Sequence, residues 1–234
     1  MNSKVKSPKI TVVFLCGYMS DMEGTKSECL NDFCTESGLG YFAFDYSGHG
    51  SSSGDVKKGS ISQWSQEAIY MVESFVKTPV ILVGSSMGGW ISLLTALKLK
   101  GKVQGILNIA GAPDFTEDLI FAEFTEDDKK QIKEKGEVTV YRGECEYCIS
   151  NDFIEDGRNN LLLRDNISID CPVVLLHGMQ DEVVPIETSM TVMEKLSSEK
   201  VKAIVKKNSD HRMSSEEDLQ VLKKEIQELV TILC

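Results

Sequence analysis

The chain has 234 residues, of which 41% are hydrophobic, and it carries a formal net charge of −11 at pH 7. This length suits one domain with a large buried core, so a single domain over residues 1–234 is predicted. The negative charge disfavours binding to nucleic-acid phosphates or to anionic lipid. No segment approaches the roughly 18 apolar residues that a spanning helix needs, so neither a nucleic-acid partner nor stable membrane insertion is expected.

The seven cysteines are odd in number and irregularly spaced, which is typical of reduced thiols in an intracellular protein. Cys145 and Cys148 form one C-x-x-C pair, but no second pair of ligands stands nearby, so packing residues and no zinc site are expected. The sequence offers no motif for another metal or an organic cofactor. The apolar stretch from Ile10 to Cys16 is too short for a signal peptide. We therefore predict a cytoplasmic location, or the mitochondrial matrix for the mature form of a eukaryotic protein.

Short β-branched runs alternate with amphipathic segments along the first half of the chain, the pattern of a parallel sheet covered by helices. Apolar residues recur every three or four positions from Ile61 to Phe75, which predicts a helix with one apolar face. In chain order, the predicted elements are strand Thr11–Gly17, helix Thr25–Glu36, strand Tyr41–Tyr46, helix Ser62–Val76, strand Pro79–Gly84, helix 88–100 and strand Val103–Gly111.

The alternation is interrupted between about residues 113 and 170. We predict one helix in this segment, because Thr125 can cap its start and Gly136 can end it; the rest is interpreted as mixed and polar. The alternation resumes with strand Pro172–Gly178, helix Glu187–Leu196, strand Val201–Val205 and a helix from Ser215. The prediction is a mostly parallel sheet with helices on both faces and a small lid insertion that could cover a substrate.

The sequence VILVGSSMGGW contains a G-x-S-x-G pattern formed by Gly84, Ser86 and Gly88. It lies between a predicted strand and a predicted helix, where the serine occupies a strained turn and side chains at the flanking positions would collide with the backbone. Ser85 lacks such flanking glycines. We therefore predict Ser86 as a nucleophile for acyl transfer, with the backbone N–H of Met87 as one donor to the oxyanion.

The chain holds three histidines, and their positions differ. His49 lies in a glycine-rich turn and His177 near the end of a predicted strand, where turn stabilisation and a hydrogen-bonded core position are the simpler interpretations. His211 follows the last predicted strand, and catalytic side chains gather in such loops of α/β sheets. Asp181 follows the preceding strand in the same way. The order Ser86, Asp181, His211 is the one expected of hydrolases that carry this strand–turn–helix motif.

The blocks GYMSDMEGTK, FDYSGHGSSSG, GSSMGGW, HGMQDEVVP and SDHRM resemble the α/β hydrolases of the mitochondrial palmitoyl-protein thioesterase and acyl-glucuronide esterase type. The resemblance runs through most of the chain and is weakest in the insertion. It implies an α/β-hydrolase fold, hydrolysis of esters or thioesters, and a triad of Ser86, His211 as base and Asp181 as the acid that orients the base. Many members carry a histidine where Cys16 stands here, and the backbone N–H of Tyr18 would supply the second oxyanion donor.

Apolar side chains of the insertion could form the wall of an acyl-binding pocket, namely Phe115, Leu119 and Phe124, with Ile120 and Phe121 at similar spacing. Met179 and Met213 flank the predicted acid and base, and the adaptable thioether of methionine suits variable apolar ligands. The alternative is that these residues pack within their own domain. The expected partner is a small-molecule ester or an acylated substrate with a medium or long chain.

Two other functions remain open. A serine peptidase of the same fold would need carboxylates to hold a peptide amine, and the insertion offers Glu117, Asp118, Glu123, Glu126, Asp127 and Asp128. A solvated helix face explains these residues more simply. A binding protein on an inactive hydrolase scaffold is the second alternative, although such proteins usually lack a triad residue. The sequence carries no signal for an oligomeric state.

Overall fold

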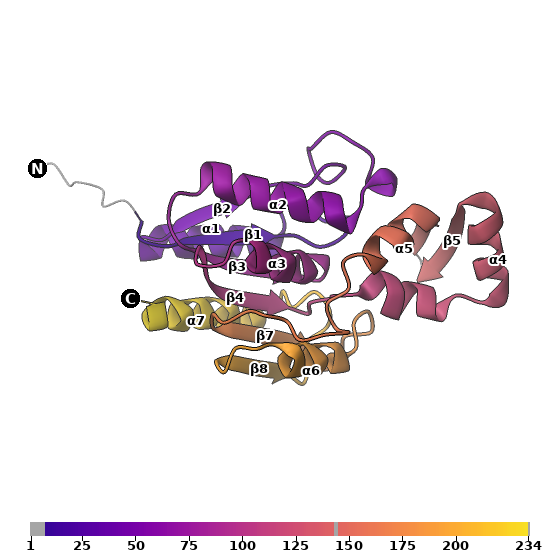
Figure 1. Cartoon of the computed structure of the whole chain (residues 1–234). Helices are drawn as coiled ribbons and strands as arrows, with labels where there is room; N and C mark the ends of the chain where they lie inside the picture. Colours follow the sequence, from indigo (N-terminus) through magenta and orange to yellow (C-terminus); the bar gives the residue numbers. More distant parts are fainter. Residues whose placement is uncertain (1–7, 143–144, 234) are drawn as a thin grey trace, which may run out of the picture.

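A six-stranded parallel sheet forms the centre of the molecule (Figure 1). The computed structural model describes residues 8–142 and 145–233. Neighbouring strands follow the order β2-β1-β3-β4-β7-β8, with the bounds Gly40–Ala43, Thr11–Leu15, Val80–Ser85, Val103–Ile109, Val173–Gly178 and Val201–Lys206. Every residue of β1, β3 and β7 is buried, because a parallel sheet is covered on both faces and its strands are apolar throughout.

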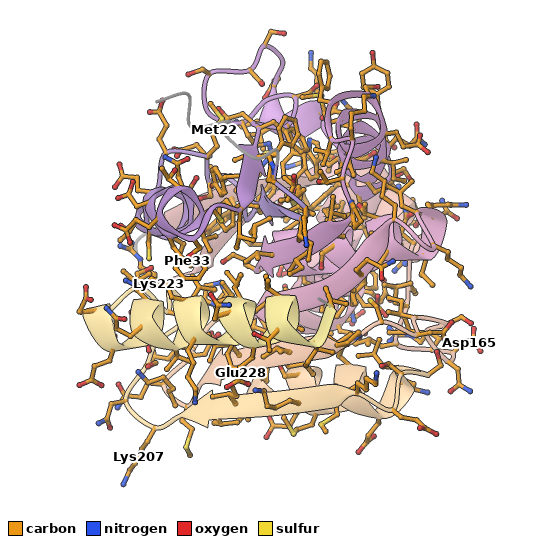
Figure 2. The ribbon with its side chains drawn as sticks, turned by 90° about the vertical axis from the view of Figure 1, so that its left-hand side faces the viewer. Met22, Phe33, Asp165, Lys207, Lys223 and Glu228 are labelled. Carbon is orange, nitrogen blue, oxygen red and sulfur yellow. The ribbon has the colours of Figure 1, made fainter. Side chains whose placement is uncertain are left out.

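Helices cover the two faces of the sheet, as predicted. They are α1 (Thr25–Ser37), α2 (Ile61–Phe75), α3 (Met87–Lys98), α6 (Ile186–Lys195) and α7 (Glu216–Leu233), with a short 3₁₀ turn at Val56–Lys58. α2 packs beside α3, and α1 packs beside α7. Figure 2 shows Glu228 of α7 turned toward β8, where Lys202 Nζ lies 2.6 Å from Glu228 Oε2. No helix in the described part of the chain has both the length and the apolarity that crossing a bilayer requires.

The predicted strands and helices of the sheet region are all present, with ends that differ by a few residues. The strand predicted to reach Gly111 stops at Ile109, because Ala110 turns into the left-handed region with φ 45°. The strand predicted over Tyr41–Tyr46 is shorter and ends at Ala43, the last residue that pairs with β1. Both differences lie at strand ends, where local sequence patterns specify the boundary weakly.

Between β4 and β7 the chain leaves the sheet and forms the inserted segment, residues 110–172. It contains a π-helical turn (Thr116–Ile120), a 3₁₀ turn (Phe121–Glu123), α4 (Glu126–Lys135), antiparallel strands β5 (Glu137–Arg142) and β6 (Cys145–Ser150), and α5 (Asn151–Arg158). Figure 1 shows α4, α5 and β5 together at one end of the molecule, beyond the sheet.

α4 begins and ends where the sequence predicts. Thr125 Oγ1 accepts from Asp128 N at 3.1 Å while Thr125 N donates to Asp128 Oδ2 at 2.9 Å, a reciprocal capping box. Gly136 ends the helix with φ 81°, a conformation that suits glycine. No further element was predicted in this segment, whose remainder was interpreted as mixed and polar, but β5, β6 and α5 are regular elements. They are short, and short segments show their periodicity over few residues.

Contacts with α2, α3 and the loop after β1 fix the inserted segment in place. Ser62 N, at the start of α2, donates to Asp156 Oδ2 at 2.9 Å. Trp90 Nε1 of α3 donates to the carbonyl oxygen of Asn160 at 3.1 Å. The ring of Tyr18 stacks on the ring of Phe153 in α5, with centroids 5.6 Å apart. The segment is therefore held over the carboxyl ends of the central strands.

Candidate active site

Ser86 stands in the tight turn between β3 and α3. Its backbone has φ 55° and ψ −119°, a conformation that is costly for a residue with a side chain. A Cβ on Gly84 would collide with the carbonyl group of Gly88, and a Cβ on Gly88 would collide with the carbonyl group of Leu15. These collisions are the physical reason for a glycine two residues before the serine and another two residues after it.

Backbone hydrogen bonds hold the strained turn. Ser86 N donates to Ile109 O at 2.9 Å, and Ser86 O accepts from Gly89 N at 2.8 Å and from Ala112 N at 3.1 Å. The turn is therefore tied to β4, to α3 and to the start of the inserted segment. A strained conformation persists when its surroundings over-determine it in this way.

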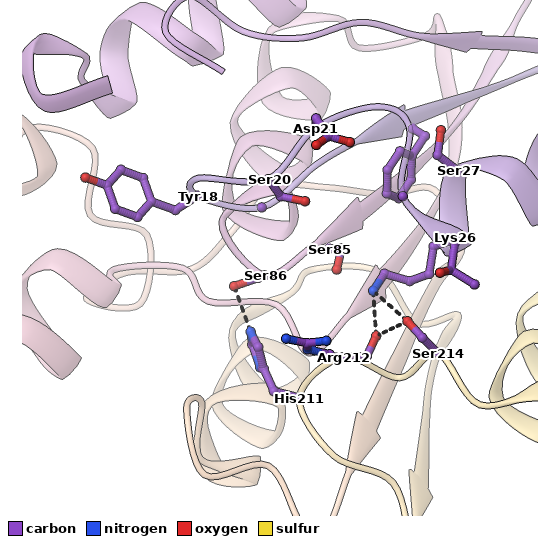
Figure 3. A pocket seen from close by; sticks show the side chains of 14 residues that line it. Tyr18, Ser20, Asp21, Lys26, Ser27, Ser85, Ser86, His211, Arg212 and Ser214 are labelled. Carbon is purple, nitrogen blue, oxygen red and sulfur yellow. Dashed lines mark hydrogen bonds between the residues drawn. The ribbon is translucent and has the colours of Figure 1, made fainter. Parts of the chain in front are cut away.

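Three side chains that are distant in the sequence meet at this edge of the sheet. His211, in the loop after β8, places Nε2 3.1 Å from Ser86 Oγ and Nδ1 2.8 Å from Asp181 Oδ2. Figure 3 shows the contact between Ser86 and His211. The side chain of Asp181, which follows β7, is 1% exposed, whereas that of His211 is 22% exposed. The structure thus brings the predicted nucleophile, base and acid into one hydrogen-bonded line.

The carboxylate of Asp181 is surrounded by donors. Oδ1 accepts from Val183 N at 2.9 Å and from Val184 N at 2.8 Å, and Oδ2 faces His211 and His177. Burial alone would raise the pKa of Asp181, but the hydrogen bonds from His177, His211 and the backbone outweigh burial and hold the pKa well below its usual range. The acid is therefore ionised at neutral pH.

The other two histidines do not contact Ser86. His177 is 1% exposed, and its Nδ1 lies 2.8 Å from Ser189 Oγ, in keeping with the interpretation as a core histidine. Its Nε2 also lies 3.2 Å from Asp181 Oδ2, a contact that sequence reasoning missed. His49 is buried, and its ring packs edge-on against Trp64 with centroids 5.0 Å apart. It has a packing position at the glycine-rich turn.

The loop after β1 approaches the nucleophile closely. A Cβ on Gly17 would lie 3.3 Å from Ser86 Cβ, a tight contact that would require Ser86 to shift by a few tenths of an ångström. Tyr18 and Met87 both line the cavity beside Ser86, and their roles as oxyanion donors stay predictions. Cys16 is buried, and burial raises the pKa of its thiol to about 12. Its thiol is therefore uncharged at neutral pH.

Two pockets of different character open on Ser86. The first, about 420 Å³, has mostly polar and charged walls, which include Ser20, Asp21, Lys26, Ser27, Ser85, Arg212 and Ser214 (Figure 3). The second, about 320 Å³, has mostly apolar walls, which include Met87, Ala112, Phe115, Leu119, Ile120, Val140, Tyr147, Ile149, Val183 and Val184. Tyr18, Ser86, His211 and Arg212 line both pockets, so Ser86 lies between a polar and an apolar space.

Of the predicted wall residues, the structure places Phe115, Leu119 and Ile120 in the apolar pocket. The other four, Phe121, Phe124, Met179 and Met213, do not line it. Phe124 is 6% exposed and packs inside the inserted segment, Met179 is 61% exposed, and Met213 is 1% exposed. Met179 thus faces solvent and Met213 faces the core. Closeness in sequence to Asp181 or His211 does not decide where a side chain points.

Part of the apolar wall was missed by sequence reasoning. β5 contributes Val140 and β6 contributes Ile149, both from the hairpin that was not predicted. The alternation in EVTVYR is a period-two signal that could have indicated this strand. Val183 and Val184, which follow the acid, also line the pocket, so the same short loop serves both the acid and the wall.

Lys26, at the start of α1, reaches across the polar pocket to the loop that carries His211. Its Nζ donates to Arg212 O at 2.5 Å and to Ser214 Oγ at 3.4 Å (Figure 3). Burial lowers the pKa of Lys26 to about 8, so the ammonium form still prevails at neutral pH. This side chain ties the loop after β8 to the helix that follows β1.

Among the residues that the structure describes, no three His, Cys, Asp or Glu side chains are grouped so that they could hold a metal ion. Of the C-x-x-C pair, Cys148 lies on β6, where its Sγ donates to Glu137 Oε2 at 3.4 Å. The side chain of Cys145 falls outside the described part of the chain. The contact of Cys148 therefore joins the two strands of the hairpin.

Known proteins resemble this chain over most of its length. A family model described as serine aminopeptidase matches residues 6–125. The mitochondrial palmitoyl-protein thioesterase ABHD10 of Homo sapiens is 36% identical over 230 residues, which cover 97% of this chain and 75% of that protein. The structure of ABHD10 from mouse is similar with a TM-score of 0.90 at 35% identity, over 96% of this chain and 90% of that one. The structure of a hydrolase from Agrobacterium vitis is similar with a TM-score of 0.91 at 35% identity, over 96% of this chain and 90% of that one.

Proposed function

This chain belongs to the family of α/β hydrolases that contains the palmitoyl-protein thioesterase ABHD10, and from that premise we propose that it hydrolyses carboxylic esters or thioesters through an acyl-enzyme on Ser86. The observation that carries the proposal is the hydrogen-bonded line from Ser86 Oγ through His211 to the buried carboxylate of Asp181, with spacings of 3.1 and 2.8 Å. These spacings suit transfer of a proton from a nucleophile to a base that a carboxylate orients.

In the proposed reaction, His211 Nε2 takes the proton of Ser86 as Oγ attacks the substrate carbonyl carbon, and Asp181 stabilises the resulting imidazolium. The backbone N–H groups of Tyr18 and Met87 hold the oxyanion, and each contributes roughly 2.7–4 kcal/mol if it acts like other such donors. His211 then gives its proton to the departing alcohol or thiol. Water repeats the cycle, which releases the carboxylic acid and restores the serine hydroxyl.

The two pockets support a direction for the substrate. The apolar pocket, with Phe115 and Leu119 in its wall, suits a medium or long acyl chain, because burial of each methylene contributes about 0.8 kcal/mol. The polar pocket, which includes Lys26 and Asp21, suits the alcohol or thiol part and the incoming water. We propose that the inserted segment acts as a lid over the acyl chain.

A peptidase activity is the second candidate, since the matching family model is described as serine aminopeptidase. It would require free carboxylates in the inserted segment. Instead, Glu117 Oε2 lies 2.7 Å from Arg158 Nε, Asp118 pairs with Arg164, and Asp128 caps α4. These carboxylates already have partners within the segment, which favours an ester or a thioester over a peptide with a free amine.

A fluorophosphonate probe and a substrate panel test the proposal. The probe is expected to modify Ser86, as mapped by mass spectrometry, whereas an inactive scaffold would stay unlabelled. The panel holds p-nitrophenyl esters, acyl-cysteine thioesters and acyl-CoA, from acetyl to palmitoyl, with aminoacyl amides for comparison. Hydrolysis that improves with chain length is expected. Activity confined to acetyl esters would contradict the apolar pocket as the acyl site, and faster cleavage of amides would favour the peptidase.

The names of the relatives also bear on the cellular location. The similar thioesterases of several mammals are named as mitochondrial proteins. We therefore favour the mitochondrial alternative of the sequence analysis over the cytoplasm for this chain. Fractionation of cells that express the protein would place it in one compartment or the other.

A further inference from the structure

A second histidine contacts the acid of the site. His177, in β7, is 1% exposed, and its Nε2 lies 3.2 Å from Asp181 Oδ2, the oxygen that faces His211 Nδ1 at 2.8 Å. We propose that His177 is a positioning residue for hydrolysis, which donates from Nε2 to Asp181 and thereby sets the orientation and the proton affinity of His211. The inference rests on the proposed function, because it needs Ser86 and His211 to act as nucleophile and base.

The neighbours of His177 determine where its proton lies. Nε2 faces the carbonyl oxygen of Val184 at 2.9 Å and the Asp181 carboxylate, and both groups can only accept. Nε2 therefore carries a hydrogen. Nδ1 faces the hydroxyl of Ser189 at 2.8 Å, which can donate. A ring protonated on Nε2 suits each of these partners, with its one hydrogen shared between the Val184 carbonyl oxygen and the Asp181 carboxylate.

This arrangement restrains the carboxylate on both oxygens. Oδ1 accepts from the backbone N–H groups of Val183 and Val184, while Oδ2 receives the two imidazoles. The carboxylate of Asp181 cannot rotate without losing a hydrogen bond from the backbone or a contact with an imidazole ring. Because the ring of His177 is itself held by the buried Ser189 of α6, the orientation of the acid depends on α6 as well as on the loop after β7.

The shared oxygen also has an electrostatic consequence. A donor from His177 draws charge from Oδ2, so the carboxylate stabilises a proton on His211 less than it would alone. Loss of that donor should raise the proton affinity of His211. The other charged groups near His211 are Arg212, Lys26 and Asp21 in the polar pocket; Asp210 precedes it, and Glu182 beside the acid is exposed. None of these groups changes when His177 is replaced.

Two substitutions of His177 separate the donor from the space it fills. The His177→Gln amide can donate from about the position of Nε2, whereas the shorter amide of His177→Asn reaches Ser189 and not Asp181. For His177→Asn, kcat/KM on a p-nitrophenyl ester should fall about tenfold, the loss of one hydrogen bond. The acid limb of its pH profile should move up by about half a pH unit. For His177→Gln, the acid limb of the pH profile should stay at the wild-type position.

An equal loss of activity in both variants, with the acid limb unmoved, would show a merely structural role and overturn the proposal. A further measurement needs no variant, in case His177→Asn does not fold. The ¹⁵N spectrum of the wild-type protein should show His177 with a proton on Nε2, and a proton on Nδ1 alone would refute the assignment. Fluorophosphonate labelling of the wild type reports separately on the proposed function, so a failure of either idea can be recognised.

Discussion

Two regions surround Ser86, and they are held in place by different means. The edge of the sheet carries Ser86, Asp181 and His211 on turns that backbone hydrogen bonds and glycine contacts define. The inserted segment, residues 110–172, presents side chains of several short elements, such as Phe115 and Ile149, to the apolar pocket. At the sheet edge, main-chain contacts fix the conformation of the turns. The shape of the apolar pocket depends instead on the side chains that line it.

The difference teaches where substitutions should act. A change at the sheet edge alters either the reacting groups or the backbone that aims them, so activity or stability should fall steeply. A change in the wall alters only the fit of an acyl chain, and apolar contacts are individually weak and adaptable. The predictions below test this division, beginning with the largest effect.

Ser86→Ala should lower turnover by about 10⁶-fold, because no other group can form the acyl-enzyme. Circular dichroism and the melting temperature should stay close to those of the wild type. Ser85→Ala is the matched control, since Ser85 lines the polar pocket next to the nucleophile and should tolerate the change. Substantial turnover by a folded Ser86→Ala protein would remove the serine from its role.

Asp181→Asn should lower kcat by about 10⁴-fold, since an amide can stabilise neither the required tautomer of His211 nor its cation. The exposed neighbour Glu182 offers a control, and Glu182→Gln should have little effect on kcat. A loss in Asp181→Asn of less than tenfold would mean that the buried carboxylate only stabilises the fold.

Gly88→Ala should destabilise the protein by about 3 kcal/mol, as expected of an added methyl group that meets a rigid backbone, here the carbonyl of Leu15. A Cβ on Gly24 meets nothing within 4 Å, and its φ is −75°. Gly24→Ala should therefore change stability by about 0.5 kcal/mol or less. Urea unfolding measures both variants, and equal values would show that the sheet edge is not rigid.

Leu119→Ala should reduce kcat/KM for a long-chain ester about tenfold, the effect of roughly 1.4 kcal/mol of lost apolar contact. Hydrolysis of an acetyl ester should be nearly unchanged. Met179→Ala serves as the comparison, because Met179 is 61% exposed and lies outside the pocket. If both variants lose activity equally on every chain length, the acyl chain does not bind against the inserted segment.

The last prediction concerns the pH dependence of stability that Lys26 causes. Burial lowers its pKa from 10.5 to about 8, so the unfolded chain binds more protons than the folded one between these values. The stability of the wild type should therefore rise with pH through this window, relative to Lys26→Met. Urea unfolding on both sides of the window tests this, with the exposed Lys207→Met as control. Parallel pH profiles of wild type and Lys26→Met would contradict it.

Much of the sheet region could be predicted because its signals are local. The elbow around Ser86 is marked by glycines that backbone crowding requires, and α4 is marked by the Thr125 cap and by Gly136. The fold of the sheet and its family were recognised for the same reason, and both are confirmed by the relatives. The hairpin of β5 and β6 was missed although EVTVYR alternates, because its strands are short and show the period-two pattern over only a few residues.

The sequence by itself determined the alternation of strands and helices, the strained serine turn and the candidates for base and acid, because each depends on neighbouring residues. Only the tertiary structure decided that His177 shares Asp181 with His211, that Val140 and Ile149 complete the apolar wall, and that Met179 and Met213 do not. These outcomes depend on residues far apart in the chain becoming neighbours, such as Asp181 and His211. Side-chain direction across such pairings is set by packing, which local patterns do not encode.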